Sequence, residues 1–225
     1  REFLRRSGLA ASAAAAWPNL ALSQGSPASA ATIRVGVMGL SRGMAHINAL
    51  MAIPDVRIAY VCDVDDTRLE QGLKRVADRQ EQPAKAVKDF RRILDDPSVD
   101  ALTIATPNFW HAPATILACA AGKHVYVEKP GSHNAHEAEL MVRAARKYQR
   151  QVQMGNQRRS WPAIIEMMEK LHSGAIGQVR SARCWYSGAR PSIGHGKQVP
   201  VPDGLDYALW QGPAPTRPYV DNLVH

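Results

Sequence analysis

The chain has 225 residues, of which 45% are hydrophobic and 21% are charged, and its formal net charge is +8 at pH 7. This composition excludes an intrinsically disordered chain, and the length allows one large hydrophobic core or two smaller ones. The basic residues alternate with acidic ones along helical segments and lack aromatic neighbours for base stacking, so we expect no nucleic-acid partner.

The first 30 residues differ in composition from the rest of the chain. Basic Arg1, Arg5 and Arg6 precede an apolar stretch of small residues, and a polar segment follows that ends in Ala-Ser-Ala at 28–30. This order is typical of a secretory signal peptide, and the apolar stretch is too short to span a membrane. The opening "REFLR" resembles the end of a twin-arginine export motif. We therefore expect residues 1–30 to be a signal peptide for the twin-arginine export machinery and the protein to be exported to a bacterial periplasm; an ordinary amphipathic helix is the alternative.

Residues 31–155 alternate short apolar runs with longer helical patterns. The runs predict strands and the segments between them predict helices, which is the arrangement of βαβ units around a parallel sheet. We therefore expect an α/β fold, a Rossmann-type doubly wound parallel sheet that binds a dinucleotide. The predicted strands are 33–38, 57–62, 86–87, 101–105, 124–127 and 151–154, and the predicted helices are 43–52, 67–79, 89–95, 112–121 and 135–148.

Residues 156–225 follow a different pattern. A helix is predicted over 162–174, and the alternating run at 178–188 predicts a half-exposed strand. A Pro- and Gly-rich segment then extends over 191–218. We expect this part to be the start of an α+β second domain that is incomplete at its carboxyl end.

The chain contains three cysteines, Cys62, Cys119 and Cys184. They are widely spaced, and each is flanked by apolar or aromatic residues. An odd and scattered set does not fit a disulfide framework or a metal site, so we expect three buried free thiols and no bound metal.

The turn after the first predicted strand, "VGVMGLSRGMAH", lies where a dinucleotide fingerprint is expected. It departs from the GxGxxG pattern, because Ser41 stands at the second glycine position and Gly43 comes one residue early. Gly39 can still make the tight turn, and the amides of residues 41–43 begin a helix whose positive end suits a pyrophosphate. A purely structural turn is the alternative.

The second predicted strand leads into Asp63, which lies 24 residues after Gly39, near the spacing at which an acidic residue binds a cofactor ribose. A carboxylate there accepts hydrogen bonds from both ribose hydroxyls and repels a 2′-phosphate. We therefore expect NAD, with NADP as the alternative because Arg68 is close in sequence. Asp63 could instead cap the helix that begins near residue 67, which Asp65 or Asp66 could do equally well.

The segment "ATPNFWH" places polar residues at the carboxyl end of the predicted strand 101–105. Pro107 ends the strand, and Thr106, Asn108 and His111 present short polar groups that could line the nicotinamide side of the crevice. His111 could instead be only a residue at a helix N-terminus.

The segment "VYVEKPGSHN" ends the predicted strand 124–127 with Glu128 and Lys129. Because successive side chains of a strand point to opposite sides, we expect only one of the two to face the cofactor. A desolvated lysine beside a nicotinamide ring could hold or relay the proton of a reacting hydroxyl, its pKa lowered from about 10.4 by burial and by the charge of the oxidised cofactor. The alternative is a surface ion pair of little energetic value.

Five segments, "TPNFWH", "GKHVYVEKP", "GNQRRS", "SGAIGQV" and "LWQGPAP", together resemble the family of glucose-fructose oxidoreductase, inositol dehydrogenase and MocA (Gfo/Idh/MocA). Within that family the chain is most similar to exported bacterial members with a twin-arginine leader. The resemblance implies that Lys129 is catalytic and that Asn156 and Arg158 border the substrate. It also implies cofactor contacts at Gly39, Ser41, Arg42, Gly43, Asp63, Thr106, Pro107, Asn108, His111, Glu128, Lys129 and Gln157.

The last five residues, "DNLVH", have the Asp-x-x-x-His spacing of the acid-base histidine of the family. They lack its glycine-rich lead-in, so we expect the true motif beyond residue 225 and assign His225 to the substrate pocket. The resemblance further implies that residues 156–225 belong to a substrate and oligomerisation domain with an open sheet, and that the complete protein is a homo-oligomer.

The activity implied by the resemblance is that of an NAD(P)-dependent oxidoreductase acting on a sugar, polyol or related hydroxylated small molecule by hydride transfer. In an exported enzyme the cofactor should be tightly bound, because the compartment holds no free pool of it. Two alternatives stay open: an NAD-dependent glycosidase that works by transient oxidation and elimination, and a noncatalytic cofactor-binding protein.

Overall fold

The structure is a computed structural model, and it describes residues 32–189 and 191–224. The predicted signal peptide at 1–30 and the candidate substrate residue His225 lie outside the described residues. Within the described ranges, no helix has the length and apolar character needed to cross a membrane.

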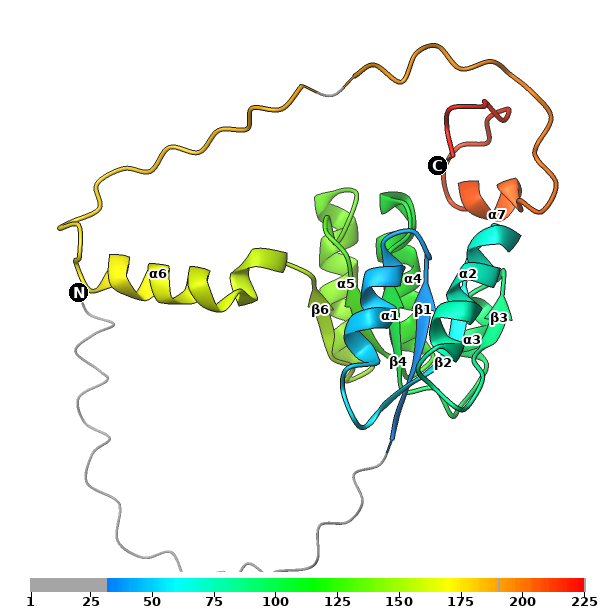
Figure 1. The fold of residues 1–225 in the computed structure, drawn as a ribbon, viewed down its shortest axis with the longest axis horizontal. Helices are drawn as coiled ribbons and strands as arrows, with labels where there is room; N and C mark the ends of the chain where they lie inside the picture. The colour runs from blue at the N-terminus through cyan, green and yellow to red at the C-terminus, as the bar shows by residue number, and fades with distance from the viewer. Residues whose placement is uncertain (1–31, 190, 225) are drawn as a thin grey trace, which may run out of the picture. The chain divides into compact units, whose positions relative to one another are not determined.

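A six-stranded parallel sheet forms the centre of the fold (Figure 1). Its strand order, β3-β2-β1-β4-β5-β6, is that of a doubly wound Rossmann sheet, with the reversal of direction between β1 and β4. The predicted fold class is confirmed, including the short strand near residue 86. The strands are β1 Ile33–Met38, β2 Val56–Cys62, β3 Lys85–Val87, β4 Ala101–Ile104, β5 His124–Val127 and β6 Val152–Met154.

The helices that connect the strands begin and end within four residues of their predicted bounds. Asp65 caps α2, because its side chain accepts hydrogen bonds from the amides of Thr67 and Arg68 at 2.8 and 3.2 Å. Helix α4 begins directly after Pro107, earlier than predicted, and Pro113 lies inside it. The helices are α1 Gly43–Leu50, α2 Asp66–Ala77, α3 Arg91–Leu94, α4 Asn108–Ala120 and α5 Ala135–Lys147.

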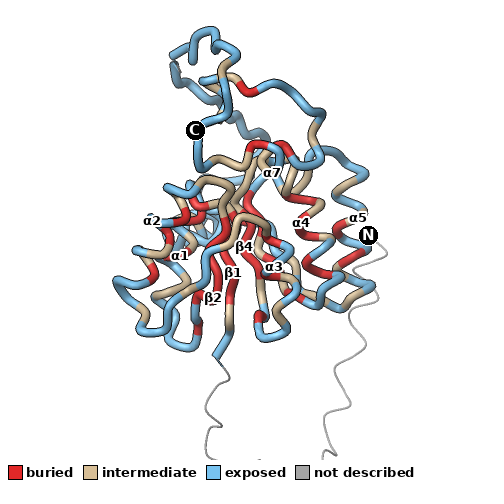
Figure 2. The backbone as a smooth tube through the Cα atoms, turned by 90° about the vertical axis from the view of Figure 1, so that its right-hand side faces the viewer, coloured by how far each residue is buried: buried red, intermediate tan, exposed pale blue. Residues whose placement is uncertain are grey.

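The inner strands are covered on both faces, as parallel sheets require. Figure 2 shows β1, β2 and β4 as largely buried, and the side chains of Val37, Val61, Leu102, Ile104 and Val127 are all fully buried. One hydrophobic cluster joins the sheet to α1 and α2, and a second joins it to α3, α4 and α5. Burial of each large apolar side chain contributes roughly 1.5–3 kcal/mol, which explains why the short apolar runs form these strands.

Residues 156–224 add a short 3-10 helix, η2 Gln157–Ser160, and two helices, α6 Pro162–His172 and α7 Tyr207–Gln211. The strand predicted at 178–188 is wrong: the structure has no strand there, and the described residues from 172 to 198 are all exposed. A strand without a neighbour leaves its backbone groups unpaired, and the described part of the chain offers this segment no neighbour. The open sheet expected for a second domain is therefore not formed by the described residues.

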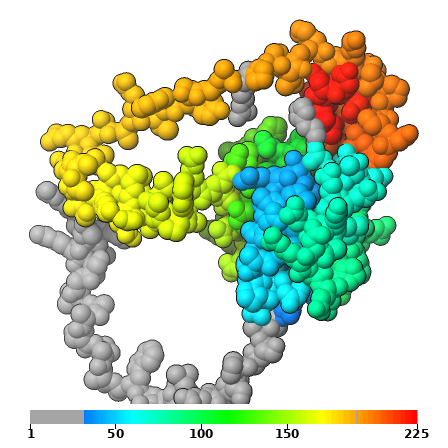
Figure 3. All heavy atoms as spheres, viewed as in Figure 1, coloured from blue at the N-terminus to red at the C-terminus, as the bar shows by residue number. Residues whose placement is uncertain are grey.

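The segment that contains α7 returns to the carboxyl end of the sheet. The amide of Asp206 donates to the carbonyl of Val64 at 2.9 Å, and an antiparallel bridge pairs Leu205 with Asp65. Figure 3 shows this segment, coloured orange to red, against the cyan surface of the chain around α2. Helix α7 thus lies beside the turn that follows β2.

Candidate functional site

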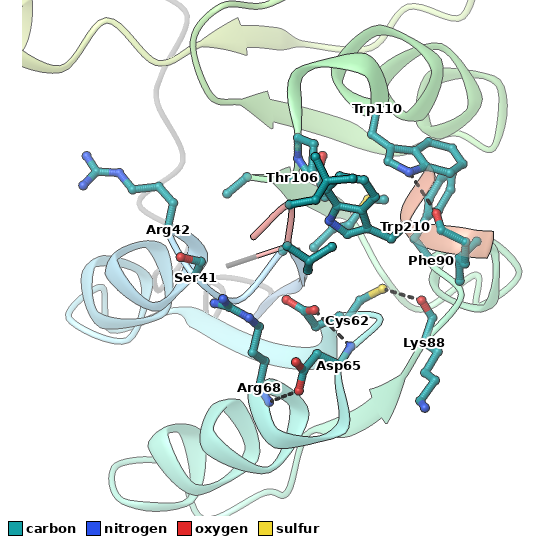
Figure 4. A pocket seen from close by; sticks show the side chains of 18 residues that line it. Ser41, Arg42, Cys62, Asp65, Arg68, Lys88, Phe90, Thr106, Trp110 and Trp210 are labelled. Carbon is teal, nitrogen blue, oxygen red and sulfur yellow. Dashed lines mark hydrogen bonds between the residues drawn. The ribbon is translucent and has the colours of Figure 1, made fainter. Parts of the chain in front are cut away.

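Two cavities lie at the carboxyl end of the strands, the edge at which open parallel sheets bind ligands. We name them the β2 cavity, of about 320 Å³ and lined by Asp63 (Figure 4), and the β5 cavity, of about 350 Å³ and lined by Glu128. Arg42, Ala105 and Thr106 line both cavities. The two are therefore neighbouring parts of one crevice, which crosses the reversal between β1 and β4.

All of the predicted cofactor residues except Gly43 line one or both cavities. Those in the β2 cavity are Gly39, Ser41, Arg42, Asp63, Thr106 and Pro107. Those in the β5 cavity are Arg42, Thr106, Asn108, His111, Glu128, Lys129 and Gln157. Gly43 is buried at the start of α1, where a Cβ would lie 3.0 Å from Val37 Cγ1, so its small size allows close packing of helix on strand.

The turn between β1 and α1 requires glycine at its first position. Gly39 has a φ of +85°, and a Cβ on it would lie 2.6 Å from the carbonyl oxygen of Ala105. Beyond the turn, α1 begins with no side-chain cap from Arg42. The amides of Gly43 and Ala45 donate to the carbonyls of Gly39 and Arg42 at 3.1 and 3.0 Å, so it is the positive end of the helix dipole that is available to an anion in the crevice.

Asp63 is held in the β2 cavity by two backbone amides. Its Oδ2 accepts a hydrogen bond from Leu40 at 2.7 Å, and its Oδ1 accepts one from Asp65 at 3.2 Å. Burial raises the pKa of Asp63 above its ordinary value, and the two hydrogen bonds offset this only in part. The alternative role of Asp63 as a helix cap is wrong, because Asp65 caps α2. Asp63 is thereby left to face a ligand.

The turn after β4 supplies a hydroxyl to the crevice. Thr106 Oγ1 is buried and has no hydrogen-bond partner among the described residues. Because an unsatisfied buried hydroxyl is unfavourable, this atom favours a polar ligand group at the boundary between the two cavities.

His111 connects the turns on either side of the β5 cavity. Its side chain is 1% exposed, with Nδ1 2.6 Å from the carbonyl oxygen of Pro130 and Nε2 2.9 Å from that of Thr106. His111 is the fourth residue of α4, so it does lie in the first turn of the helix, as the alternative stated, and it also lines the β5 cavity. Its contacts fix the Thr106 turn relative to the turn that follows Lys129.

Glu128 turns toward α1 and not toward the side chain of Lys129. Its Oε1 lies 3.2 Å from His46 Nε2 and 3.4 Å from Arg42 Nε, and its Oε2 accepts a hydrogen bond from the Lys129 amide at 3.2 Å. Burial raises the pKa of Glu128, but these hydrogen bonds outweigh it and hold the pKa below its ordinary value. With Glu128 only 6% exposed and paired to α1, the predicted alternative of a surface ion pair between Glu128 and Lys129 is wrong.

Lys129 lines the β5 cavity and is exposed. The described residues therefore do not desolvate it, contrary to expectation. The expectation that only one of Glu128 and Lys129 faces the site is also wrong, because both line the β5 cavity. Strand β5 ends at Val127, so the alternation of side chains no longer applies at these two residues.

The three candidate substrate residues have different outcomes. Asn156 and Arg158 are exposed and line neither cavity, whereas Gln157 between them lines the β5 cavity. The 3-10 helix η2 explains this separation, since its tight turn directs successive side chains to different sides. His225 lies outside the described residues.

The cysteine prediction is correct for two of the three thiols. Cys62 and Cys119 are free and buried, and burial raises the pKa of each thiol. Cys184 is free but exposed, because it lies in the segment for which the structure provides no covering layer. Within the described residues, no group of three or more His, Cys, Asp or Glu side chains could hold a metal ion.

Sequence reasoning missed several residues of the crevice. His46, the partner of Glu128, lies on α1 and is 82 residues away in sequence, so no local pattern predicts the pairing. Trp110 and Trp210 line the β2 cavity. Both belong to segments that carry the family resemblance, "TPNFWH" and "LWQGPAP", but nothing in those segments identifies a common cavity.

The residues of the crevice fit a dinucleotide. The uncapped start of α1 suits a pyrophosphate, the Asp63 carboxylate suits a pair of ribose hydroxyls, and the unpartnered hydroxyl of Thr106 lies between them and the β5 cavity. Lys129, Asn108 and the remaining polar residues of the β5 cavity then lie where a reacting group and its substrate would meet.

Residues 33–156 match a family described as oxidoreductases with an NAD-binding Rossmann fold. The chain is 33% identical over 154 residues to a glycosyl hydrolase family 109 protein of Saccharopolyspora erythraea, which covers 66% of this chain and 33% of that protein. It is 28% identical over 194 residues to myo-inositol 2-dehydrogenase of Thermotoga maritima, which covers 86% of this chain and 52% of that protein. The chain thus spans about a third to a half of the length of these relatives.

The solved structures that are similar to the chain include the following two. KijD10, a 3-ketoreductase from Actinomadura kijaniata in complex with NADP and TDP-benzene, has a TM-score of 0.59 and 26% identity, over 66% of this chain and 44% of that one. An NAD binding oxidoreductase from Klebsiella pneumoniae has a TM-score of 0.56 and 29% identity, over 65% of this chain and 40% of that one.

Proposed function

The chain belongs to the Gfo/Idh/MocA family of oxidoreductases with an NAD-binding Rossmann fold, and on that premise we propose that it is part of an enzyme that transfers hydride between a nicotinamide cofactor and a hydroxylated carbon of a sugar, polyol or related small molecule. The observation that carries this proposal is one crevice with Asp63 in its first part and Lys129 in its second. When bound, the cofactor would supply the hydride acceptor or donor.

The residues of the β2 cavity would hold the cofactor. Asp63 would accept hydrogen bonds from the ribose hydroxyls, and the positive end of α1 would face the pyrophosphate. Because the Asp63 carboxylate repels a 2′-phosphate, we propose NAD as the preferred cofactor over NADP. Arg68 lines the same cavity, so the preference is best measured directly, as the ratio of the two dissociation constants.

The residues of the β5 cavity would take part in transfer of the proton of the reacting hydroxyl. Lys129 would hold or relay the proton of the reacting hydroxyl. The Lys129 amide is bound by Glu128, and the following carbonyl of Pro130 is bound by His111, so the backbone that carries the lysine is fixed at two points. Glu128 would remain ionised, because His46, Arg42 and the Lys129 amide stabilise its charge.

The test is mass spectrometry of the small molecules released when the full-length protein, purified without added cofactor, is denatured. Stoichiometric NAD, together with loss of turnover but not of NAD in Lys129→Ala, is the expected result. A protein that neither contains nor binds NAD or NADP would overturn the proposal. Normal turnover in Lys129→Ala would remove this lysine from the mechanism, and NAD binding without turnover on any tested sugar or polyol would favour a noncatalytic cofactor-binding protein.

A second function is favoured by the similarity to a glycosyl hydrolase family 109 protein. In an NAD-dependent glycosidase, a sugar hydroxyl would be oxidised to a carbonyl and the glycosidic substituent would leave by elimination. Water would then add to the resulting double bond, and the carbonyl would be reduced again within the same turnover. The same crevice would serve both reactions. Product analysis distinguishes them, because oxidation yields a keto sugar or lactone whereas the glycosidase yields a freed sugar with no net redox change.

We further propose that the protein is exported with its cofactor already bound. The composition of residues 1–30 supports export through the twin-arginine machinery, which carries folded proteins. A compartment without free NAD requires a retained cofactor that is regenerated within each cycle. Fractionation of the native bacterium tests this, and recovery of the protein in the cytoplasm alone would contradict it.

A further inference from the structure

The β2 cavity has a wall that comes from outside the six-stranded domain. Leu209 and Trp210 of α7, with Leu223 and Val224, line it together with Trp110 of α4. Figure 4 shows Trp110 and Trp210 on the side of the cavity away from Arg42. The cavity thus combines polar groups at the ends of β1 and β2 with an aromatic wall from a segment about 150 residues further along the chain.

Backbone hydrogen bonds connect the segment before α7 to the turn that follows Asp63. The amide of Asp66 donates to the carbonyl of Gly204 at 3.2 Å, and the amide of Asp206 donates to the carbonyl of Val64 at 2.9 Å. Lys88 Nζ donates to the same Gly204 carbonyl at 2.9 Å. The position of α7 is therefore coupled to the position of the carboxylate.

Trp110 provides a second attachment. Its Nε1 donates to the carbonyl of Leu209 at 3.1 Å, and a Cβ on Gly212 would overlap its ring. The chain that follows α7 thus packs directly on the Trp110 indole. Any residue with a Cβ at position 212 would require the chain or the indole to move.

Neighbouring aromatic rings orient Trp210. Tyr207 is stacked with it, with ring centroids 5.6 Å apart and an interplanar angle of 19°. Phe109 makes an edge-to-face contact with it at 5.6 Å. Two rings from different helices therefore restrict the indole to one orientation at the cavity.

The chemistry of this wall matches a nucleobase. In a dinucleotide the ribose that Asp63 would bind carries the adenine, and adenine is a planar aromatic group that stacks on indole rings. We infer that Trp210 and Trp110 form the adenine-binding wall of the crevice, so that α7 holds the cofactor in place from outside the Rossmann domain. This inference rests on the proposed function. It assigns a specific segment to the retention of the cofactor, because the adenine would pack against α7.

The experiment compares Trp210→Ala with the full-length unaltered protein. The matched control is Trp185→Ala, since Trp185 is 76% exposed and lines neither cavity. For each protein, the dissociation constant and dissociation rate of NAD are measured by exchange with isotopically labelled NAD, and AMP is used as a probe for the adenine part alone. Thermal unfolding without ligand establishes that each variant is folded.

Trp210→Ala is expected to weaken NAD about 5- to 150-fold, which corresponds to roughly 1–3 kcal/mol of base stacking, chiefly through faster dissociation. AMP should weaken by a similar factor, Trp210→Phe should recover most of the affinity, and Trp185→Ala should bind like the unaltered protein. If Trp210→Ala does not fold, the same comparison is made with Trp210→Phe, expected to weaken NAD less than tenfold but measurably.

Two outcomes would overturn the inference. If the unaltered protein binds NAD and the Trp210 variants bind NAD and AMP equally well, α7 does not contact adenine, while the proposed function stands. If the unaltered protein binds neither NAD nor NADP, the proposed function and this inference fail together.

Discussion

The replacement Gly39→Ala tests the geometry of the crevice at the turn between β1 and α1. A Cβ at this position would lie 2.6 Å from the carbonyl oxygen of Ala105, 2.7 Å from its carbonyl carbon and 2.9 Å from the amide nitrogen of Thr106. All three atoms belong to the backbone of the turn after β4, so the contact is relieved only if one of the two turns moves. The φ of +85° adds a separate cost for any residue with a Cβ.

The expected loss of stability follows from these two contributions. The left-handed conformation costs about 1–2 kcal/mol, and overpacking costs about 1–3 kcal/mol, which together amount to roughly 2–5 kcal/mol. For chains of about 150–250 residues, each kcal/mol lowers Tm by about 2–4 °C. We therefore expect Gly39→Ala to lower Tm by roughly 4–20 °C, and NAD affinity to fall at least about tenfold because the displaced turns carry the start of α1 and Thr106.

The control is Gly122→Ala, measured by the same thermal unfolding and NAD titration. Gly122 has a φ of +78°, but no atom lies within 4 Å of the Cβ it would gain. It should therefore show only the conformational cost of about 1–2 kcal/mol and unchanged NAD affinity. Equal losses of stability in the two variants would refute the reasoning, since the close approach of Gly39 to Ala105 would then contribute nothing.

Three further predictions concern the residues around β2 and the thiols. Asp65→Ala should destabilise the fold by about 0.5–2 kcal/mol through loss of the α2 cap, measured by denaturant unfolding, and a change in m-value would show that more than the cap was lost. Because burial raises the folded-state pKa of Asp63, its charge destabilises the protein without ligand at neutral pH, and this cost disappears as the pH falls through the raised pKa toward the ordinary value of 3.8. The stability of Asp63→Asn relative to the unaltered protein should therefore decrease on acidification, on top of a cost independent of pH because an Asn amide can accept only one of the two backbone hydrogen bonds. The variant should also bind NAD less tightly; a stability difference independent of pH would contradict this. In the native protein a thiol reagent should react rapidly with Cys184 alone, and rapid labelling of either buried thiol, Cys62 or Cys119, would show that the core around it opens.

Local sequence patterns were sufficient to predict the strands and helices of the sheet and the residues that directly follow the strands. The alternation of short apolar runs with amphipathic segments predicts each strand and helix of the sheet, because burial on both faces of a parallel sheet selects such runs. The positions of Gly39 and Asp63 follow in the same way, since both come directly after a strand and the carboxyl ends of parallel strands share one edge.

The same reasoning fails where a pattern has more than one structural outcome. Residues 178–188 alternate as a strand does, but alternation becomes a strand only when another strand supplies hydrogen-bond partners. The helix predicted over 112–121 begins earlier in the structure, at Asn108, so His111 belongs to the first turn of α4. Asp63 and Asp65 were equivalent capping candidates in sequence, and only the backbone geometry assigned the cap to Asp65.

The sequence by itself determined the class of the fold, the edge of the sheet that carries the site and most residues along that edge, because each of these follows from periodicity and strand ends. Only the tertiary structure decided that Glu128 pairs with His46 and that α7 brings Trp210 to the β2 cavity. These contacts join segments 82 residues or more apart in sequence. They depend on how helices pack on the sheet, and that packing is a property of the whole chain which no local pattern encodes.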